Sequence, residues 1–272
     1  MPHPTDQTYL LTDQYWNAEN LYARIRLHKR FSLNKYGWSR WVFDQITAPP
    51  ESNILELGCG PAILWQQNLD RLPEQWHITL SDFSPGMLQE AQQRLHDAGR
   101  PFTFQIIDAQ SIPYDDASFD IVIANHMLYH VPDLARALVE IRRVLRPAGR
   151  LYASTIGEMH MQEVDELIRH VVPGTGRWGI RVKASFTLEK GRELLSPYFS
   201  HITLKRYEDA LVVTEAEPLI AYVLSGAAKA VLTGDRLSAF SSLVEQELAA
   251  HGAIRISKES GLFEASGIRK LP

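Results

Sequence analysis

Short apolar runs alternate with helical patterns through the middle of the chain, between residues 53 and 156. Each run is rich in Ile, Val, Leu or Phe, and nearly continuous apolar runs are typical of strands buried on both faces. The predicted strands are residues 53–57, 77–81, 102–107, 119–124 and 150–155. Because strands and helices alternate, the pattern predicts an α/β protein with a parallel sheet wrapped by helices.

The helices between these strands have recognisable beginnings and ends. Ser84 can cap a helix that has Pro85 in its first turn, and Gly99 would end this helix. Its apolar stripe consists of Leu88, Ala91 and Leu95. A second helix is predicted after Pro132 and would stop at residues 147–149. The stripe of this second helix consists of Leu134, Leu138, Ile141 and Leu145.

The flanking segments have different patterns from this core. Residues 1–47 hold many aromatic side chains among basic ones, which predicts helices that cover the sheet or its open end. Residues 157–200 predict an inserted lid, whose parts are a helix at 159–171, a glycine-rich connector at 173–176 and a second helix from Thr187. The rest, 201–272, predicts C-terminal strands at 201–214 and 254–266, which can form a hairpin, and helices at 218–232 and 236–251. We expect a single domain over 1–272, with its core at 48–156.

Composition and charge narrow the range of partners. The chain has 28 Lys and Arg residues against 32 Asp and Glu residues, and it has no run of basic residues that could contact successive phosphates. A nucleic-acid partner is therefore disfavoured. The single cysteine, Cys59, cannot form an internal disulfide, and the N-terminus lacks an export pattern. No apolar stretch approaches the roughly 20 residues of a membrane span. We therefore expect a cytoplasmic protein, monomeric or homodimeric, with a small-molecule substrate and no membrane partner.

The strand at 53–57 runs directly into a glycine-rich turn that contains Gly58 and Gly60. Glycine lets a backbone approach a ligand closely, so the turn indicates a nucleotide-like ligand, although an ordinary tight turn explains a glycine pair equally well. Ile63 stands where a dinucleotide-binding motif has its third glycine, and the chain has no Tyr-x-x-x-Lys pair. Both observations disfavour a nicotinamide-dependent oxidoreductase.

Carboxylates follow two further strands. Asp82 comes 22 residues after Gly60, and a carboxylate there can accept hydrogen bonds from both hydroxyls of a ribose. Helix capping is the alternative role for Asp82, but Ser84 already supplies a cap. Asp108 ends the third strand. Because the ends of parallel strands meet at one edge of the sheet, these residues should converge on one crevice.

The glycine-rich turn resembles the first motif of class I S-adenosylmethionine (SAM)-dependent methyltransferases, Glu-x-Gly-x-Gly-x-Gly. Glu56, Gly58 and Gly60 match this motif, and Ala62 replaces the last glycine. Segments 125–133 and 140–149 resemble the small-molecule branch of that family, type 11 methyltransferases related to those of quinone biosynthesis. The resemblance covers about residues 50–157. It implies a Rossmann-like, doubly wound, mostly parallel seven-stranded sheet with an antiparallel late strand.

The resemblance also implies an activity and a cofactor site. SAM would donate its methyl group to the O, N or C of a small-molecule acceptor and leave as S-adenosylhomocysteine. In the family, the acidic residue at Asp108 receives the adenine amino group, and the strand-four loop at Asn125 faces the sulfonium. The candidate cofactor-binding residues are Glu56, Gly58, Cys59, Gly60, Asp82, Phe83, Met87, Asp108, Ala109, Gln110, Asn125, Tyr15 and Tyr22. Tyr15, Trp16 and Tyr22 could cover the sulfonium by cation–π attraction, or pack on the helices of the sheet.

His126 is the candidate catalytic residue. Its unperturbed pKa near 6.5 suits a general base for the acceptor, while a structural histidine is an equal alternative. His126 and His130 have the i, i+4 spacing of metal ligands, but no third ligand is evident and no metal is predicted. The candidate substrate-binding residues are Trp16, His130, Glu158, His160, Trp178 and Arg181.

Two rival functions use the same cofactor. A nucleic-acid methyltransferase acting on exocyclic amino groups usually carries Asn/Asp-Pro-Pro-Tyr/Phe after the fourth strand, where this chain has Asn125-His126-Met127-Leu128. The negative net charge also disfavours that function. A non-catalytic SAM-binding sensor or structural partner would keep the same glycines and carboxylates, so it remains the main alternative.

Overall fold

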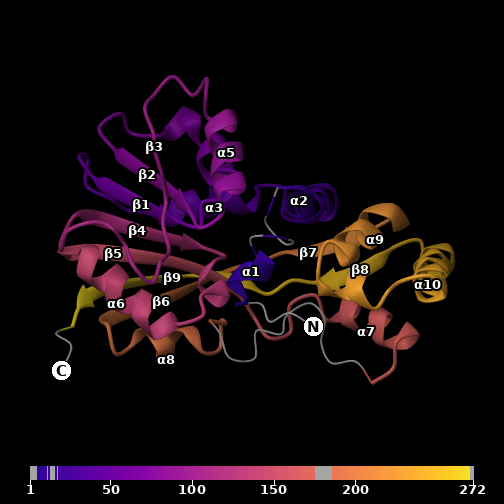
Figure 1. The fold of residues 1–272 in the computed structure, drawn as a ribbon. Coiled ribbons are helices and arrows are strands. Elements are labelled where there is room, and N and C mark those ends of the chain that lie inside the picture. The colour runs from indigo at the N-terminus through magenta and orange to yellow at the C-terminus, as the bar shows by residue number, and fades with distance from the viewer. Residues whose placement is uncertain (1–4, 11, 13–15, 17, 175–185, 270–272) are drawn as a thin grey trace.

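A computed structural model describes residues 5–10, 12, 16, 18–174 and 186–269. Within these residues a seven-stranded sheet has the order β3-β2-β1-β4-β5-β9-β6, as Figure 1 shows. Strand β9 is antiparallel to both of its neighbours, and the remaining pairs are parallel. The strands are β1 (Asn53–Leu57), β2 (His77–Asp82), β3 (Thr103–Ile106), β4 (Phe119–Asn125), β5 (Leu145–Ile156), β6 (Phe199–Tyr207) and β9 (Ser260–Ile268). The predicted Rossmann-like sheet with one antiparallel late strand is confirmed.

Helices cover both faces of this sheet, and alternate residues of each strand pack against opposite layers. In β1, Leu55 and Leu57 belong to one buried cluster with α6, whereas Ile54 belongs to a second buried cluster with Trp65. Ser84 caps α5 as predicted, because its side chain accepts a hydrogen bond from the backbone N–H of Met87. The helices around the sheet are α3 (Trp38–Gln45), α4 (Ile63–Gln66), α5 (Pro85–Arg94), α6 (Leu134–Val144) and α8 (Gly191–Leu195).

The late strands depart from the sequence prediction. The predicted strand at 201–214 is two strands, β6 and β7 (Ala210–Val213), and the predicted strand at 254–266 is β8 (Ile254–Ser257) followed by β9. Strand β7 pairs with β8, and β6 pairs with β9, so the four form one interrupted antiparallel ribbon. Both interruptions occur at polar residues, and Asp209 and Lys258 from the two interruptions form an ion pair. The ribbon therefore begins in the main sheet and ends outside it.

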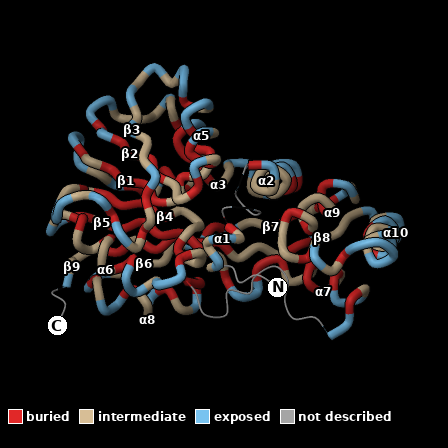
Figure 2. Tube along the Cα trace, in the orientation of Figure 1, coloured by how far each residue is buried: buried red, intermediate tan, exposed pale blue. Residues whose placement is uncertain are grey.

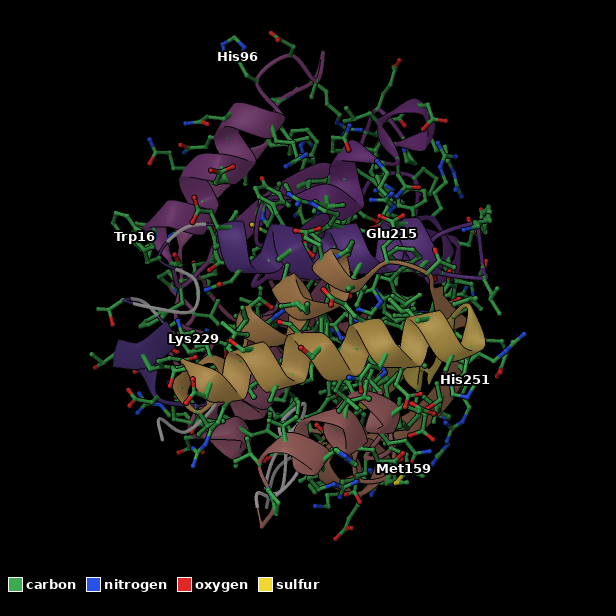
Figure 3. The ribbon with its side chains drawn as sticks, turned by 90° about the vertical axis from the view of Figure 1, so that its right-hand side faces the viewer. Trp16, His96, Met159, Glu215, Lys229 and His251 are labelled. Carbon is green, nitrogen blue, oxygen red and sulfur yellow. The ribbon has the colours of Figure 1, made fainter. Side chains whose placement is uncertain are left out.

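Residues from distant parts of the chain form an additional layer beside the main sheet, which we call the cap. It consists of the β7–β8 pair with α2 (Glu19–Phe31), α7 (Gln162–Val171), α9 (Ala216–Leu224) and α10 (Asp235–His251). These elements share a third buried cluster that includes Leu27, Ile168, Leu211, Leu219 and Phe240. Figure 2 shows buried segments in both the cap and the main sheet, and Figure 3 looks onto α10, which ends near His251.

The segments predicted as an N-terminal cover, a lid and a C-terminal region thus contribute jointly to one hydrophobic cluster. Among the described residues, no helix is both long and apolar enough to cross a membrane.

Candidate functional site

The turn after β1 holds the backbone close to the loop that follows β4. Gly58 has φ +68°, and a Cβ atom built on it would lie 2.7 Å from Cβ of Met127. Cys59 N–H donates a hydrogen bond to Ser81 O at 2.8 Å, and Ser81 Oγ donates one to Glu56 O at 2.7 Å. A side chain at position 58 is therefore excluded by both backbone conformation and space.

The Asp82 carboxylate fixes the same turn from β2. Its Oδ2 accepts a hydrogen bond from Gly60 N–H at 2.9 Å, and its Oδ1 accepts one from Ser84 N–H at 2.8 Å. Burial raises the pKa of Asp82 to about 6, although these backbone hydrogen bonds favour the charged form. Each carboxylate oxygen can accept a further hydrogen bond, so these contacts leave acceptor capacity for ribose hydroxyls.

Glu56 lies below the turn and is 1% exposed. Its carboxylate accepts a hydrogen bond from Trp65 Nε1. Burial raises the pKa of Glu56 to about 8; the hydrogen bond from Trp65 opposes this shift, and the negative charge of Asp82 adds to it. The carboxyl groups of Glu56 and Asp82 are therefore buried on neighbouring strands, and this burial makes each of them harder to ionise.

Asp108, at the end of the third strand, is engaged by two glutamines. Its Oδ1 accepts a hydrogen bond from Gln110 N–H at 2.9 Å, and Gln110 Nε2 donates to the carboxylate as well. Gln7 Nε2, from the short N-terminal helix α1 (Gln7–Tyr9), donates to Oδ2 at 3.3 Å. The N-terminal segment thus reaches the third carboxylate, a contact that sequence reasoning missed.

The ends of these strands open onto one cavity of about 800 Å³, which also extends against the cap. Its volume is within the range of small-molecule and cofactor sites. The predicted site residues that line it are Glu56, Gly58, Cys59, Gly60, Asp82, Phe83, Met87, Asp108, Ala109, Asn125, His126, His130 and His160. Residues that follow successive parallel strands therefore line one cavity, as is typical of a doubly wound fold.

Other predicted site residues lie elsewhere. Tyr22 points to α5, where its hydroxyl donates to Glu90 at 2.9 Å and accepts from Arg94 at 2.6 Å. Trp16 is 66% exposed and lies at the periphery in Figure 3. Neither they nor Gln110 and Glu158 line the cavity. Tyr15, Trp178 and Arg181 lie outside the described residues, so their roles stay predictions.

His126 follows β4 in a left-handed backbone conformation, with φ +55°. Its N–H donates to Ser154 Oγ at 2.9 Å, and its ring lies 4.9 Å from that of Trp38. Burial, and then the positive charge of Lys258, lower the pKa of His126 to about 4, so the ring is neutral near pH 7. His130 ends a short 3₁₀ helix that begins after His126, so the two do not share an α-helical face. Among the described residues, no three His, Cys, Asp or Glu side chains group as metal ligands would.

The cap side of the cavity contains functional groups that the sequence did not reveal. His28 from α2, Tyr222 from α9 and the Lys258–Asp209 ion pair all line it. A helical stripe of Leu21, Ile25 and His28 was the available signal for α2. Lys258 and Asp209 are 49 positions apart, and no local pattern in the sequence predicts that they meet.

The fold and the site together define a nucleotide-type crevice at the carboxyl edge of a seven-stranded α/β sheet. Comparison with known proteins identifies its class. The family model described as "Methyltransferase domain" matches residues 55–153. A demethylmenaquinone methyltransferase of Desulfitobacterium hafniense is 28% identical over 188 residues, which are 66% of this chain and 73% of the relative.

A ubiquinone/menaquinone biosynthesis C-methyltransferase of Desulfotalea psychrophila is 34% identical over 42% of this chain, but the match spans less than half, 45%, of that relative. A solved structure of Haemonchus contortus phosphoethanolamine N-methyltransferase 2, in complex with phosphomonomethylethanolamine and S-adenosylhomocysteine, is similar over 99% of this chain and 61% of that protein's chain. Its TM-score is 0.59 at 16% identity, which supports the fold. Residues 55–153 thus match a methyltransferase domain, and the comparisons support a SAM-dependent methyltransferase with SAM as its cofactor.

Proposed function

We propose that the protein transfers the methyl group of SAM to an O, N or C atom of a small molecule bound on the cap side of the cavity. The observation that supports this proposal is that a single cavity joins two unlike halves. One half has the carboxylates and glycine turn at the strand ends, and the other has histidine, tyrosine and apolar side chains from the cap. Two ligands that must react can therefore share one cavity.

The residues of the first half fit the cofactor. Asp82 retains acceptor capacity for the ribose hydroxyls, whereas the adenine amino group would have to replace a glutamine donor at Asp108. Gly58 and Gly60 keep the turn free of side chains where a ligand would pass. When bound, SAM supplies an activated methyl group on a positively charged sulfur.

The protein's own contribution is positioning, exclusion of water and, for acidic acceptors, proton removal. Correct alignment of two bound reactants can supply several kcal/mol of a reaction barrier. We assign His126 as the general base, because its ring is neutral, faces the cavity and lies beside Asn125 at the end of β4. Ser154 holds this loop by donating to Asn125 Oδ1 at 2.5 Å while accepting from His126 N–H.

The test has two stages. Calorimetric titration with SAM, S-adenosylhomocysteine and NAD should give binding of the two adenosyl ligands and none of NAD. Isotope-labelled SAM should then transfer its methyl group to members of an acceptor panel that contains phenols, carboxylates, amines and activated carbon acids. Adenosyl binding without transfer to any acceptor would favour the non-catalytic sensor, and NAD binding would contradict the assigned cofactor.

A further inference from the structure

The side chain of Asn125, at the end of β4, is held by hydrogen bonds from two other elements. Its Oδ1 accepts a hydrogen bond from Ser154 Oγ on β5 at 2.5 Å and another from Trp38 Nε1 on α3 at 3.3 Å. Ser154 has no exposed surface, whereas Trp38 and Asn125 both line the cavity. One amide oxygen therefore connects β5 and α3 at the cavity wall.

These two contacts determine which end of the amide is which. An indole N–H can only donate, so the atom of Asn125 that faces Trp38 must be the oxygen. The hydroxyl of Ser154 leads to the same orientation, because it accepts from His126 N–H at 2.9 Å and directs its own hydrogen to Asn125. A turned amide would place N–H groups against the indole N–H. The positions of Oδ1 and Nδ2 are thus fixed by two independent donors.

The Nδ2 group of Asn125 is the end of the amide that is left for a ligand. Among the described residues, no group accepts a hydrogen bond from it, and it is not one of the buried polar atoms without a partner. Because Asn125 lines the cavity, Nδ2 presents its N–H groups there. Both lone pairs of Oδ1 are in use. Asn125 is therefore a donor to the cavity and not an acceptor.

A fixed N–H donor discriminates between the atoms that a methyltransferase can modify. A hydroxyl oxygen has two lone pairs, so it can accept from Nδ2 with one pair and attack the methyl carbon with the other. An amine nitrogen has a single lone pair, and this pair must make the attack. The N–H groups of the amine would then face the N–H groups of Asn125, and donors that face each other stay unsatisfied.

Charge does not make this choice. Charged side chains of both signs line the cavity, including Arg24 and Asp165. The groups that contact the Asn125 amide are the uncharged side chains of Trp38 and Ser154. Discrimination at Asn125 therefore depends on the direction of a hydrogen bond between neutral groups.

We propose that Asn125 determines acceptor specificity by donating from Nδ2 to the hydroxyl oxygen of an alcohol or phenol, and that Trp38 and Ser154 are positioning residues for its amide. This proposal rests on the proposed function and selects oxygen among its possible acceptor atoms. In the transfer, a C–O bond forms while the C–S bond of the bound cofactor breaks. The electron pair of the C–S bond stays on sulfur, and the hydroxyl proton passes to His126, the assigned base.

The first experiment compares two ligands that share one apolar body and are both uncharged at pH 7. After saturation with S-adenosylhomocysteine, the protein is titrated with 2-naphthol and with 2-naphthylamine. We expect 2-naphthol to bind about fivefold or more tightly, because its oxygen can accept from Nδ2. In the acceptor panel, the methyl group should appear on hydroxyl oxygen.

The Asn125→Asp variant reverses the polarity of one atom. Aspartate has nearly the same shape and keeps an oxygen for Trp38 and Ser154, but it replaces the Nδ2 donor with an acceptor. The order of the two ligands should therefore reverse, so that 2-naphthylamine binds at least as tightly as 2-naphthol. Affinity for S-adenosylhomocysteine should stay within about twofold of the original value.

Variants of the positioning residues test how the amide is held. Trp38→Phe and Ser154→Ala each remove one donor to Oδ1 and should keep most of the preference for 2-naphthol. The double variant frees the amide to turn and should reduce the preference to about twofold or less. Trp41→Phe is the matched control, because Trp41 also lies on α3 and packs against Tyr207 but does not line the cavity. A purely structural role would weaken both ligands equally and leave their ratio unchanged.

Several results would overturn the role of Asn125. These are equal or tighter binding of 2-naphthylamine to the unmodified protein, an unchanged order of the ligands in Asn125→Asp, and methyl transfer in the panel only to amines or carbon acids. A large fall in S-adenosylhomocysteine affinity in Asn125→Asp, with the ligand order unchanged, would assign the amide to the cofactor instead. Absence of S-adenosylhomocysteine binding by the unmodified protein would contradict the proposed function itself, whereas retained binding without a preference for the hydroxyl contradicts only the inference about Asn125.

Discussion

The Asp82 carboxylate and the backbone of Gly60 form one unit, because Gly60 N–H donates to Asp82 Oδ2 at 2.9 Å. The second oxygen accepts from Ser84 N–H at the start of α5. Asp82 thus connects the glycine turn after β1 to the helix after β2. A residue expected from the sequence to hold ribose is also part of the framework that shapes the turn.

Asp82→Ala should therefore impair both binding and stability. It removes the proposed ribose acceptor, so S-adenosylhomocysteine affinity should fall about tenfold or more. It also leaves two backbone N–H groups without their acceptor, which costs about 1–3 kcal/mol for each group that stays buried. Calorimetric titration and urea unfolding measure the two effects. Asp97→Ala, at a side chain 96% exposed, is the control and should change neither.

Glu56 should make stability fall as pH rises. Its pKa in the folded protein is raised to about 8 from an ordinary value of 4.5. Between these values the folded state keeps a proton that the unfolded chain has lost, so the stabilisation present below about pH 4.5 is lost progressively up to about pH 8. The loss is on the order of a few kcal/mol.

Glu56→Gln removes this titration while keeping an acceptor for Trp65 Nε1. Urea unfolding of both proteins at pH 5 and pH 8 should show that the variant gains stability relative to the original protein as pH rises. The comparison is needed because the histidines whose pKa values are lowered change stability in the opposite direction; for His126 and His160 this change extends from about pH 3 to 6.5, and for His28 it lies below its usual pKa. A pH-independent difference would mean that Glu56 is ionised in the folded state.

Much of the sheet could be predicted because its signals are local. Five parallel strands are apolar runs, and the cap of α5 is a Ser84-Pro85 pair, so neighbours in the sequence determine them. Strand β5 begins earlier than predicted, at Leu145, because Leu145 pairs with Phe119 across a register shift that only the assembled sheet reveals. The division of the late strands at Asp209 and Lys258 likewise depends on pairing between distant residues.

The two halves of the site also differ in how far the sequence alone could predict them. The cofactor half follows from motifs in continuous segments, whereas the cap half joins α2 to residues more than a hundred positions away. His28 and Lys258 had no motif to mark them, because their role depends on a shared cavity and not on spacing. Tyr22 was a candidate cover for the sulfonium because it lies in an aromatic-rich segment. In the structure its hydroxyl instead forms hydrogen bonds with Glu90 and Arg94 on α5.

Gly58→Ala should destabilise the protein through two separable causes. The backbone at position 58 has φ +68°, and the new methyl group would meet Met127 Cβ at 2.7 Å. Gly252→Ala is a matched control, because Gly252 has φ +75° with nothing within 4 Å of the added atom. The control should cost about 1–2 kcal/mol for the left-handed backbone alone. Urea unfolding should show a larger loss for Gly58→Ala, and S-adenosylhomocysteine affinity should fall only in that variant. Equal losses of stability in the two variants would mean that Met127 and the loop after β4 can move away from the added methyl group with no loss of free energy.

His126→Asn should separate catalysis from cofactor binding. Asparagine tolerates the left-handed conformation that His126 adopts, with φ +55°, so the turn should persist. Loss of a general base should reduce turnover of an acidic acceptor by about 10²–10⁴-fold, while S-adenosylhomocysteine affinity stays within about twofold. Turnover with the acceptor found in the panel and calorimetric titration measure the two quantities. Parallel loss of both would indicate that His126 has a structural role.

Lys258 and Asp209 should behave as a coupled pair that holds the ribbon where it leaves the main sheet. Their side chains are 8% and 0% exposed, so each charge depends on the other for compensation. Hydrogen bonds from Lys258, Ser32 and Asn34 outweigh the opposing effect of burial and lower the pKa of Asp209. Removing one partner should cost about 3–5 kcal/mol, as for other buried pairs. The Lys258→Met/Asp209→Asn double variant should lose less than the sum of the single variants, because it leaves no isolated charge. Urea unfolding of the four proteins closes this cycle, and strictly additive losses would show that the two charges do not interact.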